Sequence, residues 1–158
     1  MSKVALFDPI TIKSKVFRNR IVLSPMCQYK AVDGLVSDWH FQHYSRFAFS
    51  GLGAAFIEAT GVSPEGRIGH GCTGIWSDEH IQGLSKIVKV FKEYNCVSGI
   101  QLAHAGRKAS FLRPWDGASP ITKDDSDEPA WQTIGPSAIP INDSSCLLYT
   151  SPSPRDLR

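Results

Sequence analysis

The sequence contains no long apolar run, and this absence bears on where the protein works. No uninterrupted hydrophobic stretch approaches the length that spans a membrane. The start, Met1 to Val4, lacks the apolar segment of a secretory signal. We therefore expect a cytoplasmic protein. The formal net charge is only +2 and the basic residues are scattered, so we expect neither a nucleic-acid partner nor a membrane partner.

Cysteine is scarce, and its spacing excludes the common metal and redox motifs. The chain contains four cysteines, namely Cys27, Cys72, Cys96 and Cys146. No two have the close spacing of a zinc or Cys-x-x-Cys site. In a reducing cytoplasm we expect free thiols, most of them filling small apolar spaces. His40 and His43 lie three residues apart, but no further ligand cluster accompanies them, so we predict no metal site.

Short apolar runs mark three strands. Residues 21–23 (Ile-Val-Leu) suit a strand buried on both faces. Residues 54–59 suit a second buried strand, and residues 97–102 are predicted as the third strand. Upstream, residues 7–20 are rich in β-branched side chains and predict a short hairpin or cap before the main fold.

Two helices are predicted between these strands. Ser37 and Asp38 are good N-cap residues, and Gly51 is a typical helix stop. Ser77 can cap a second helix, whose apolar residues recur at helical spacing until Asn95.

The order strand, helix, strand, helix, strand predicts parallel β/α units. The pattern itself leaves a closed barrel and an open doubly wound sheet as alternatives. No GxGxxG follows a strand and no GxxxxGK[ST] occurs, which disfavours the common nucleotide-binding folds. Residues 61–74 and 106–140 are predicted as loops, the second being long and solvated at the acidic run 124–128.

Polar or reactive residues follow each of the three strands. The strands end in Ser24–Tyr29, Glu58–Thr60 and Gln101–Arg107. In β/α folds binding sites are built at this carboxyl end, so we predict a site there. Each residue also has a plain structural interpretation. Cys27 can be a buried thiol, Glu58 a partner for Arg or Lys, Gln101 a partner for loop backbone groups, and His104 a hydrogen-bonded structural histidine.

Taken together, several segments resemble the old yellow enzyme family of NADH:flavin oxidoreductases, in its thermophilic-like and xenobiotic reductase branch. The matching segments are Asp8–Ile10, Arg18–Ile21, Ser24–Tyr29, Pro64–Ile68, Gly74–His80 and Gln101–Ala109. They occur in the family's order and spacing, and the resemblance covers roughly residues 5–141.

The resemblance implies an α/β fold, namely the N-terminal part, about three β/α units, of a TIM (β/α)8 barrel. It implies FMN as cofactor and NADPH or NADH as hydride donor. The activity implied is that of an ene-reductase, which reduces the activated double bond of an enone or nitro compound. Cys27 and Tyr29 would be catalytic, Cys27 tuning the flavin and Tyr29 binding the substrate carbonyl. The flavin would be lined by Ser24, Pro25, Met26, Cys27, Ala59 and Gln101.

The sequence also departs from the family pattern. A complete barrel takes about 250 residues, whereas this chain has 158. The family's later His-x-x-His or His-x-x-Asn pair, its proton-donating tyrosine and its phosphate-binding Arg region are absent. We therefore expect residues 1–142 to be a truncated FMN-binding barrel that is inactive alone, and residues 143–158 to be a non-native or disordered tail.

Two alternatives to the ene-reductase remain open at this point. The chain can be a non-catalytic fragment, or the N-terminal part of a related dienoyl-CoA or trimethylamine-type flavoenzyme. Cys27 and the length of the loop after the third strand favour the ene-reductase. Full-length members of the resembled branch commonly form homo-oligomers.

Overall fold

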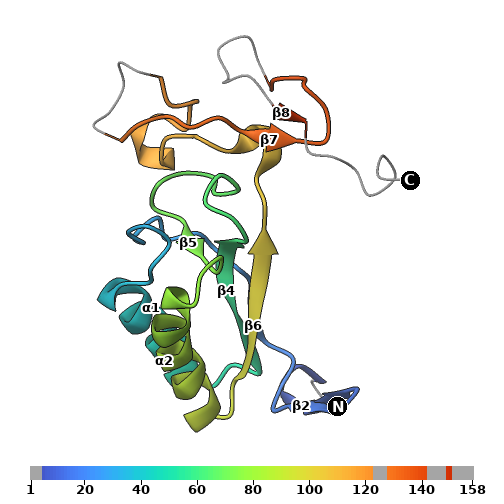
Figure 1. Ribbon diagram of the computed structural model, residues 1–158. Helices are drawn as coiled ribbons and strands as arrows, with labels where there is room; N and C mark the ends of the chain where they lie inside the picture. Colours follow the sequence, from blue (N-terminus) through green and yellow to red (C-terminus); the bar gives the residue numbers. More distant parts are fainter. Residues whose placement is uncertain (1–4, 123–127, 142–148, 151–158) are drawn as a thin grey trace.

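A parallel sheet forms the centre of the protein (Figure 1). The computed structural model describes residues 5–122, 128–141 and 149–150. The sheet consists of β3 (Val22–Leu23), β4 (Ala54–Gly61), β5 (Thr73–Gly74) and β6 (Val97–Ala103). β4 pairs in parallel with each of the other three. The three predicted strands are thus confirmed within two residues at their ends, while β5 lies inside the segment predicted as a loop.

The N-terminal segment forms the predicted hairpin. After the short 3-10 helix η1 (Ala5–Phe7), β1 (Ile10–Ile12) pairs antiparallel with β2 (Lys15–Phe17). Figure 1 shows the hairpin at the amino-terminal end of the parallel sheet. It therefore lies at the end opposite the predicted site.

Two helices pack side by side on one face of the sheet (Figure 1). α1 (Asp38–Phe49) begins after Ser37, as predicted, and the chain leaves it through Gly51 at φ +82°. α2 (Glu79–Glu93) has Asp78 as its N-cap, and the hydroxyl of Ser77 accepts a hydrogen bond from the backbone N–H of Glu79.

The main core lies between these helices and β3, β4 and β6. Burying this apolar surface supplies most of the stabilisation that folding can gain here. Its largest buried side chains are Tyr44, Ile57, Ile87 and Phe91.

A β-bulge interrupts β4 at Glu58. Ile57 pairs with Ile100 and Ala59 with Gln101, so Glu58 is an extra residue in the ladder. Regular alternation would put Glu58 on the face opposite Ile57. Instead its side chain lies on the helix side, fully buried, and Ala59 is displaced to the other face. The bulge therefore decides which face each residue at the end of β4 presents.

The face of the sheet opposite the helices is only partly covered. Val22 and Phe56 are exposed there, at 46% and 38%. The prediction that the strand at residues 21–23 is buried on both faces is therefore wrong. Among the described residues β6 pairs only with β4, and no further strand closes the sheet over this face. In a closed barrel the inward side chains of all strands would fill that space.

The segment after β6 is irregular, as predicted, with three short elements. These are η2 (Gly106–Lys108), η3 (Pro114–Asp116) and β7 (Ile134–Gly135), which pairs with β8 (Tyr149–Thr150). Within the predicted acidic run, the Glu128 side chain is 37% exposed and its carboxylate makes a two-pronged ion pair with Arg113 at 2.7 and 2.9 Å. The rest of that run lies outside the described residues, as do residues 143–148 and 151–158 of the predicted tail.

None of the helices in the described ranges is both long and apolar enough to cross a bilayer.

Candidate flavin site at the carboxyl ends of the strands

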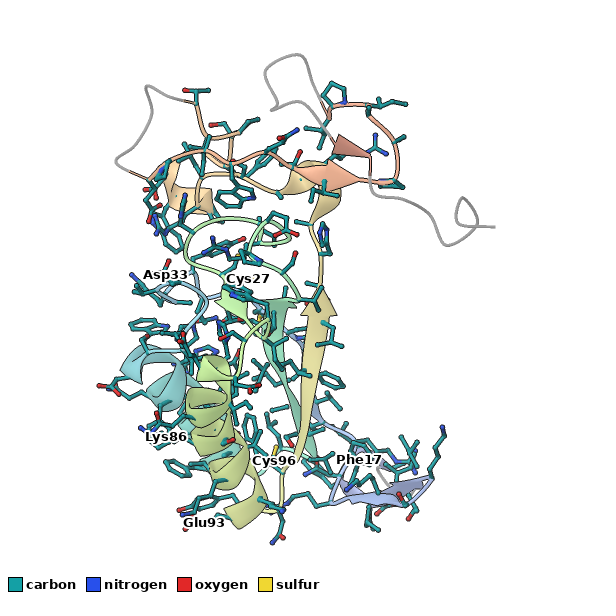
Figure 2. All side chains as sticks on the ribbon, viewed as in Figure 1. Phe17, Cys27, Asp33, Lys86, Glu93 and Cys96 are labelled. Carbon is teal, nitrogen blue, oxygen red and sulfur yellow. The ribbon has the colours of Figure 1, made fainter. Side chains whose placement is uncertain are left out.

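The predicted site residues lie at one end of the sheet. Residues Ser24–Tyr29 leave β3, while Ala59 and Gln101 are register partners near the ends of β4 and β6. Partners in a parallel ladder point to the same face, which here is the face not covered by helices. Figure 2 shows Cys27 at this end and Cys96 and Phe17 toward the other. The structure thus brings the strand-end residues together.

Gln101 offers an unused amide on the open face. Its side chain is exposed, and it makes no hydrogen bond to any residue in the described ranges. Ser24 and Met26, in the segment after β3, are also exposed, and Ala59 is half-buried. An amide can donate and accept at once, as the edge of an isoalloxazine ring requires. The small side chain of Ala59 leaves room for a planar ring. The donor set therefore fits a flavin.

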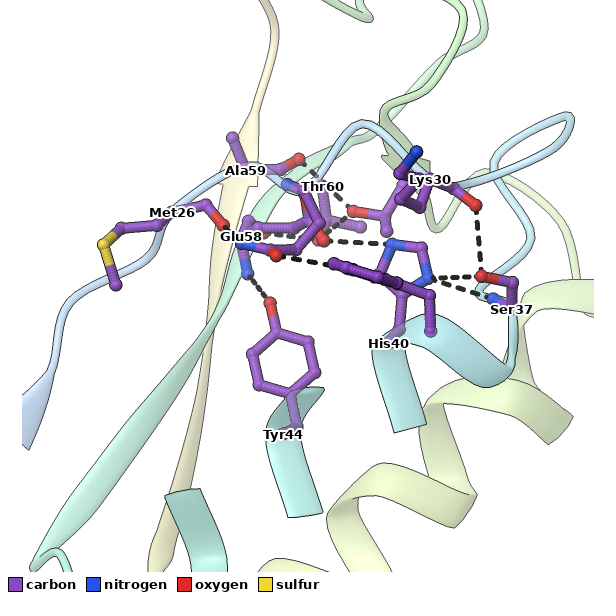
Figure 3. Close-up of polar contacts among 11 residues, drawn as sticks. Met26, Lys30, Ser37, His40, Tyr44, Glu58, Ala59 and Thr60 are labelled. Carbon is purple, nitrogen blue, oxygen red and sulfur yellow. Dashed lines mark hydrogen bonds and ion pairs between the residues drawn. The ribbon is translucent and has the colours of Figure 1, made fainter. Parts of the chain in front are cut away.

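Glu58 fastens the segment after β3 to the helix layer (Figure 3). One carboxylate oxygen accepts a hydrogen bond of 2.5 Å from the backbone N–H of Gln28. The other lies 3.1 Å from Nε2 of His40 in α1, at ion-pair distance although the ring N–H does not point straight at it. The backbone N–H of Glu58 donates to the hydroxyl of Tyr44 at 2.8 Å. Glu58 thus links β4 to the segment after β3 and to α1.

His40 is itself fixed by the start of α1. Its Nδ1 accepts a hydrogen bond of 3.0 Å from the backbone N–H of Ser37. Because Nδ1 is an acceptor, the neutral ring carries its proton on Nε2. Nε2 is the atom that faces Glu58. Both side chains are fully buried. The interpretation of Glu58 as a partner for Arg or Lys is thus corrected, since its partners are a histidine and a backbone amide.

Cys27 has a thiol neighbour that the sequence does not mark as its partner. Interaction with the thiol of Cys72, which precedes β5, together with partial burial raises the pKa of Cys27 far above its ordinary value. The same interaction, with the backbone N–H groups of Gly69 and Ile68, lowers the pKa of Cys72. The pair therefore holds its negative charge on Cys72 when one proton leaves.

Tyr29 has an unusual backbone and an aromatic neighbour from a distant loop. Its φ of 52° lies in the left-handed region, which is uncommon for a residue with a side chain. Its ring meets that of Trp115 edge to face at 5.7 Å. Burial, followed by the nearby thiols, raises the pKa of Tyr29 to about 12. The phenol consequently stays protonated near neutral pH and can donate a hydrogen bond.

Gly71 sets how closely the two cysteine-bearing segments approach. The backbone N–H of Ala31 donates to the carbonyl of Gly71 at 3.0 Å. A Cβ on Gly71 would lie 2.4 Å from the carbonyl oxygen of Tyr29. Gly71→Ala is therefore expected to push Tyr29 away and to destabilise the chain by about 1–3 kcal/mol. Urea unfolding followed by far-UV circular dichroism measures this, and an unchanged midpoint would show that the segments do not pack so tightly.

Other predicted residues occupy less central places. His104 is hydrogen-bonded, as expected, accepting from the backbone N–H of Gly106 at 3.1 Å. Among the described residues no group of three or more His, Cys, Asp or Glu side chains could hold a metal ion. Roles for Cys72 and Trp115 were not predicted from the sequence. A weak signal existed for Trp115, because aromatic residues in a long loop after a strand often reach a site.

The fold and the site define a β/α-barrel protein whose binding site is built at the carboxyl ends of its strands. Residues 5–137 match the sequence profile of the NADH:flavin oxidoreductase / NADH oxidase family. The chain therefore belongs to this family, which is the old yellow enzyme family. FMN is the family's cofactor, and NADH or NADPH supplies its electrons.

Curated relatives share this segment at substantial identity. The chain is 42% identical over 154 residues to the NADPH dehydrogenase of Geobacillus thermodenitrificans, covering 96% of this chain and 38% of that one. It is 50% identical over 106 residues to the NADPH dehydrogenase of Bacillus subtilis, covering 66% and 31%. The chain thus spans about a third of the length of these relatives.

Solved structures agree on the fold. The old yellow enzyme homologue of Zymomonas mobilis aligns with a TM-score of 0.68 at 27% identity, over 85% of this chain and 34% of the other. Morphinone reductase aligns with a TM-score of 0.67 at 25% identity, over 86% and 32%. The described sheet and helices accordingly form part of a TIM barrel.

Proposed function

We propose that this chain forms the N-terminal flavin-facing wall of an FMN-dependent ene-reductase. The observation that carries the proposal is the juxtaposition of Gln101, Ala59 and the Ser24–Tyr29 segment on one open sheet face. FMN, when bound, takes a hydride from NADPH or NADH and delivers it to the activated carbon–carbon double bond of an enone or nitro compound.

Each residue has a defined task in this proposal. Gln101 hydrogen-bonds the polar edge of the flavin ring, while Ala59 and the backbone of Ser24, Pro25 and Met26 line the ring. Cys27 would lie near the reactive part of the ring, where a neutral, polarizable thiol would tune the redox potential. In a separate role, Tyr29 donates a hydrogen bond to the substrate carbonyl, a role that its raised pKa supports.

We also propose that these 158 residues are inactive alone. The described strands leave the open face of the sheet uncovered and β6 without a second neighbour. A flavin on that face would be bound from one side only, and a free strand edge is a template for aggregation. The remaining strands of a barrel would supply the missing walls.

A chimera tests the proposal directly. Residues 5–137 would replace the matching segment of the Geobacillus thermodenitrificans NADPH dehydrogenase, and the isolated chain would be prepared in parallel. We expect the chimera to keep FMN through desalting and to oxidise NADPH when 2-cyclohexenone is added. We expect the isolated chain to do neither. A soluble chimera that binds no flavin would contradict the assignment.

Gln101 provides the sharpest single-residue test within that chimera. Gln101→Met removes the amide at similar volume, and losing one or two hydrogen bonds of about 1 kcal/mol each weakens FMN binding roughly tenfold. Titration of apoprotein, monitored by quenching of flavin fluorescence, gives the dissociation constant. Gln82→Met, at an exposed position of α2, is the matched control. Equal affinities of the two variants would remove Gln101 from the site.

A further inference from the structure

We propose that Cys27 and Cys72 form a dithiol site that closes reversibly into a disulfide under oxidation by peroxide. The site stands on the contact between two segments, one after β3 and one before β5. Its formation needs no flavin, although its effect on activity rests on the function proposed above. Nothing in the spacing of these cysteines marks them as a pair, because no Cys-x-x-Cys motif is present.

Backbone contacts hold the two segments together. The backbone N–H of Ala31 donates to the carbonyl of Gly71 at 3.0 Å. Gly71 packs against the backbone of Tyr29 so closely that even a methyl group would not fit between them. Tyr29 and Ala31 lie two and four residues after Cys27, and Gly71 directly precedes Cys72. The segments that carry Cys27 and Cys72 are therefore held against each other by backbone contacts at Tyr29, Ala31 and Gly71.

The two thiols interact strongly enough that each shifts the pKa of the other. Cys72 is only 2% exposed, whereas Cys27 is partly exposed and open to a small oxidant. The backbone N–H groups of Ile68 and Gly69 also favour a thiolate at Cys72. A thiolate beside a protonated thiol is the arrangement from which disulfides form.

The other cysteines are poorly placed to compete. Cys96 is buried in the main core at the amino-terminal end of β6, away from the site. Burial raises its pKa and so keeps it a thiol. Cys146 lies outside the described residues. Among the described cysteines, only Cys27 and Cys72 have pKa values shifted by another thiol.

The oxidation balances with hydrogen peroxide as the two-electron oxidant. The thiolate of the pair attacks one peroxide oxygen, the O–O bond breaks and hydroxide leaves, giving a sulfenic acid. The second sulfur then attacks this sulfur, the S–O bond breaks and a second hydroxide leaves. The two thiol protons convert both hydroxides to water. Two thiols are thereby oxidised to one disulfide, and one peroxide is reduced to two waters.

Closure would change the candidate flavin site at its most sensitive point. A disulfide requires the sulfurs to move to about 2 Å from each other, so the Cys27 sulfur turns toward Cys72. The thiol that faces the flavin in the proposed function is then lost. Reduction by a small dithiol restores it. The pair would thus couple the redox state of the surroundings to the flavin site.

Peptide mapping of the full chain tests the site without any flavin. Trypsin releases Cys27 in the peptide 21–30 and Cys72 in the peptide 68–86, each holding a single cysteine. The folded chain is treated with stoichiometric peroxide, alkylated with N-ethylmaleimide, digested and analysed by mass spectrometry. We expect one dominant linked peptide, 21–30 joined to 68–86, which disappears after dithiothreitol. In Cys27→Ser and in Cys72→Ser it should be absent.

The same chain oxidised in concentrated urea is the control for chance pairing. Unfolded, the four cysteines should give a mixture of pairs, whereas the folded chain should give mainly one. The proposal is overturned if the folded chain shows the mixture, or if peptides 21–30 and 68–86 stay alkylated or carry separate sulfinic acids. Because the map uses flavin-free protein, its outcome is independent of whether the chimera binds FMN.

Discussion

Replacing Glu58 by alanine is expected to lower the free energy of unfolding by about 3–5 kcal/mol, because the substitution removes a fully buried carboxylate and leaves its buried partners unpaired. The variant leaves the backbone N–H of Gln28 and the ring of His40 buried without their partner. Urea unfolding of the chimera, followed by far-UV circular dichroism, gives the difference in free energy. A protein near the stability threshold would lose its cooperative transition altogether.

Two further variants separate charge from burial at this position. Glu58→Gln keeps the shape and one acceptor oxygen, so its cost should be smaller, about 1–3 kcal/mol. Glu93→Ala removes an exposed glutamate of α2 and should change stability by no more than about 0.5 kcal/mol. If Glu58→Ala behaves like Glu93→Ala, the buried contacts do not stabilise the fold.

Substitution of Glu58 should also weaken the binding of FMN. Glu58 holds the backbone of Gln28, which lies between Cys27 and Tyr29. Once released, this segment loses the fixed placement that a preorganised site needs. We expect Glu58→Gln to weaken retention of FMN in the chimera by more than its loss of stability explains. The comparison is made well below the unfolding midpoint, where both proteins are folded.

Phe91→Ala is expected to be the most costly substitution in the apolar core, at about 3–5 kcal/mol. The Phe91 side chain is 0% exposed and meets the ring of Tyr44 edge to face at 6.0 Å between centroids. Truncation leaves a cavity between α1, α2 and the sheet that the surrounding backbone fills only in part. Tyr44 also accepts the hydrogen bond from Glu58, so part of the damage should spread toward the site.

Phe49→Ala is the matched control for that cavity. Phe49 also meets an aromatic ring, that of Tyr94 at 4.6 Å, but it is 59% exposed. Its loss should cost only about 0.5–1 kcal/mol, the contribution of an exposed aromatic pair. The difference between the two midpoints in urea measures what burial adds. Equal midpoints would mean that the region around Phe91 is not close-packed.

Local signals in the sequence predicted most of the fold. Ser37 could be predicted as the start of α1 because a helix cap interacts only with the first turn of its own helix. Asn95 marks the end of α2 because it adopts the left-handed conformation there, with φ 53°. The strands followed from short apolar runs. β5 was missed because a strand of two residues carries no pattern of its own. The exposure of Val22 was missed because burial depends on neighbours that are distant in sequence.

The candidate site was predictable only where residues follow strands. Gln101 and Cys27 could be placed at the carboxyl ends because sequence order determines that position. The partnership of Cys27 with Cys72 could not, since it arises when loops far apart in sequence fold onto each other. Nor could the contact between Glu58 and His40, because the bulge that turns Glu58 toward α1 leaves no mark in a single sequence.

The bulge in β4 also reverses which positions, odd-numbered or even-numbered, face the helices. Before Glu58, odd-numbered positions such as Ala55 and Ile57 face the helices; after it, odd-numbered Ala59 faces the open side. Deleting Glu58 alone would restore a single alternation and would leave Ala59 and the residues after it on their present faces. The extra residue therefore adds a buried carboxylate on the helix side without moving the rest of the strand end. A one-residue gap at this place in an alignment would accordingly signal the loss of that carboxylate, with Ala59 still opposite Gln101.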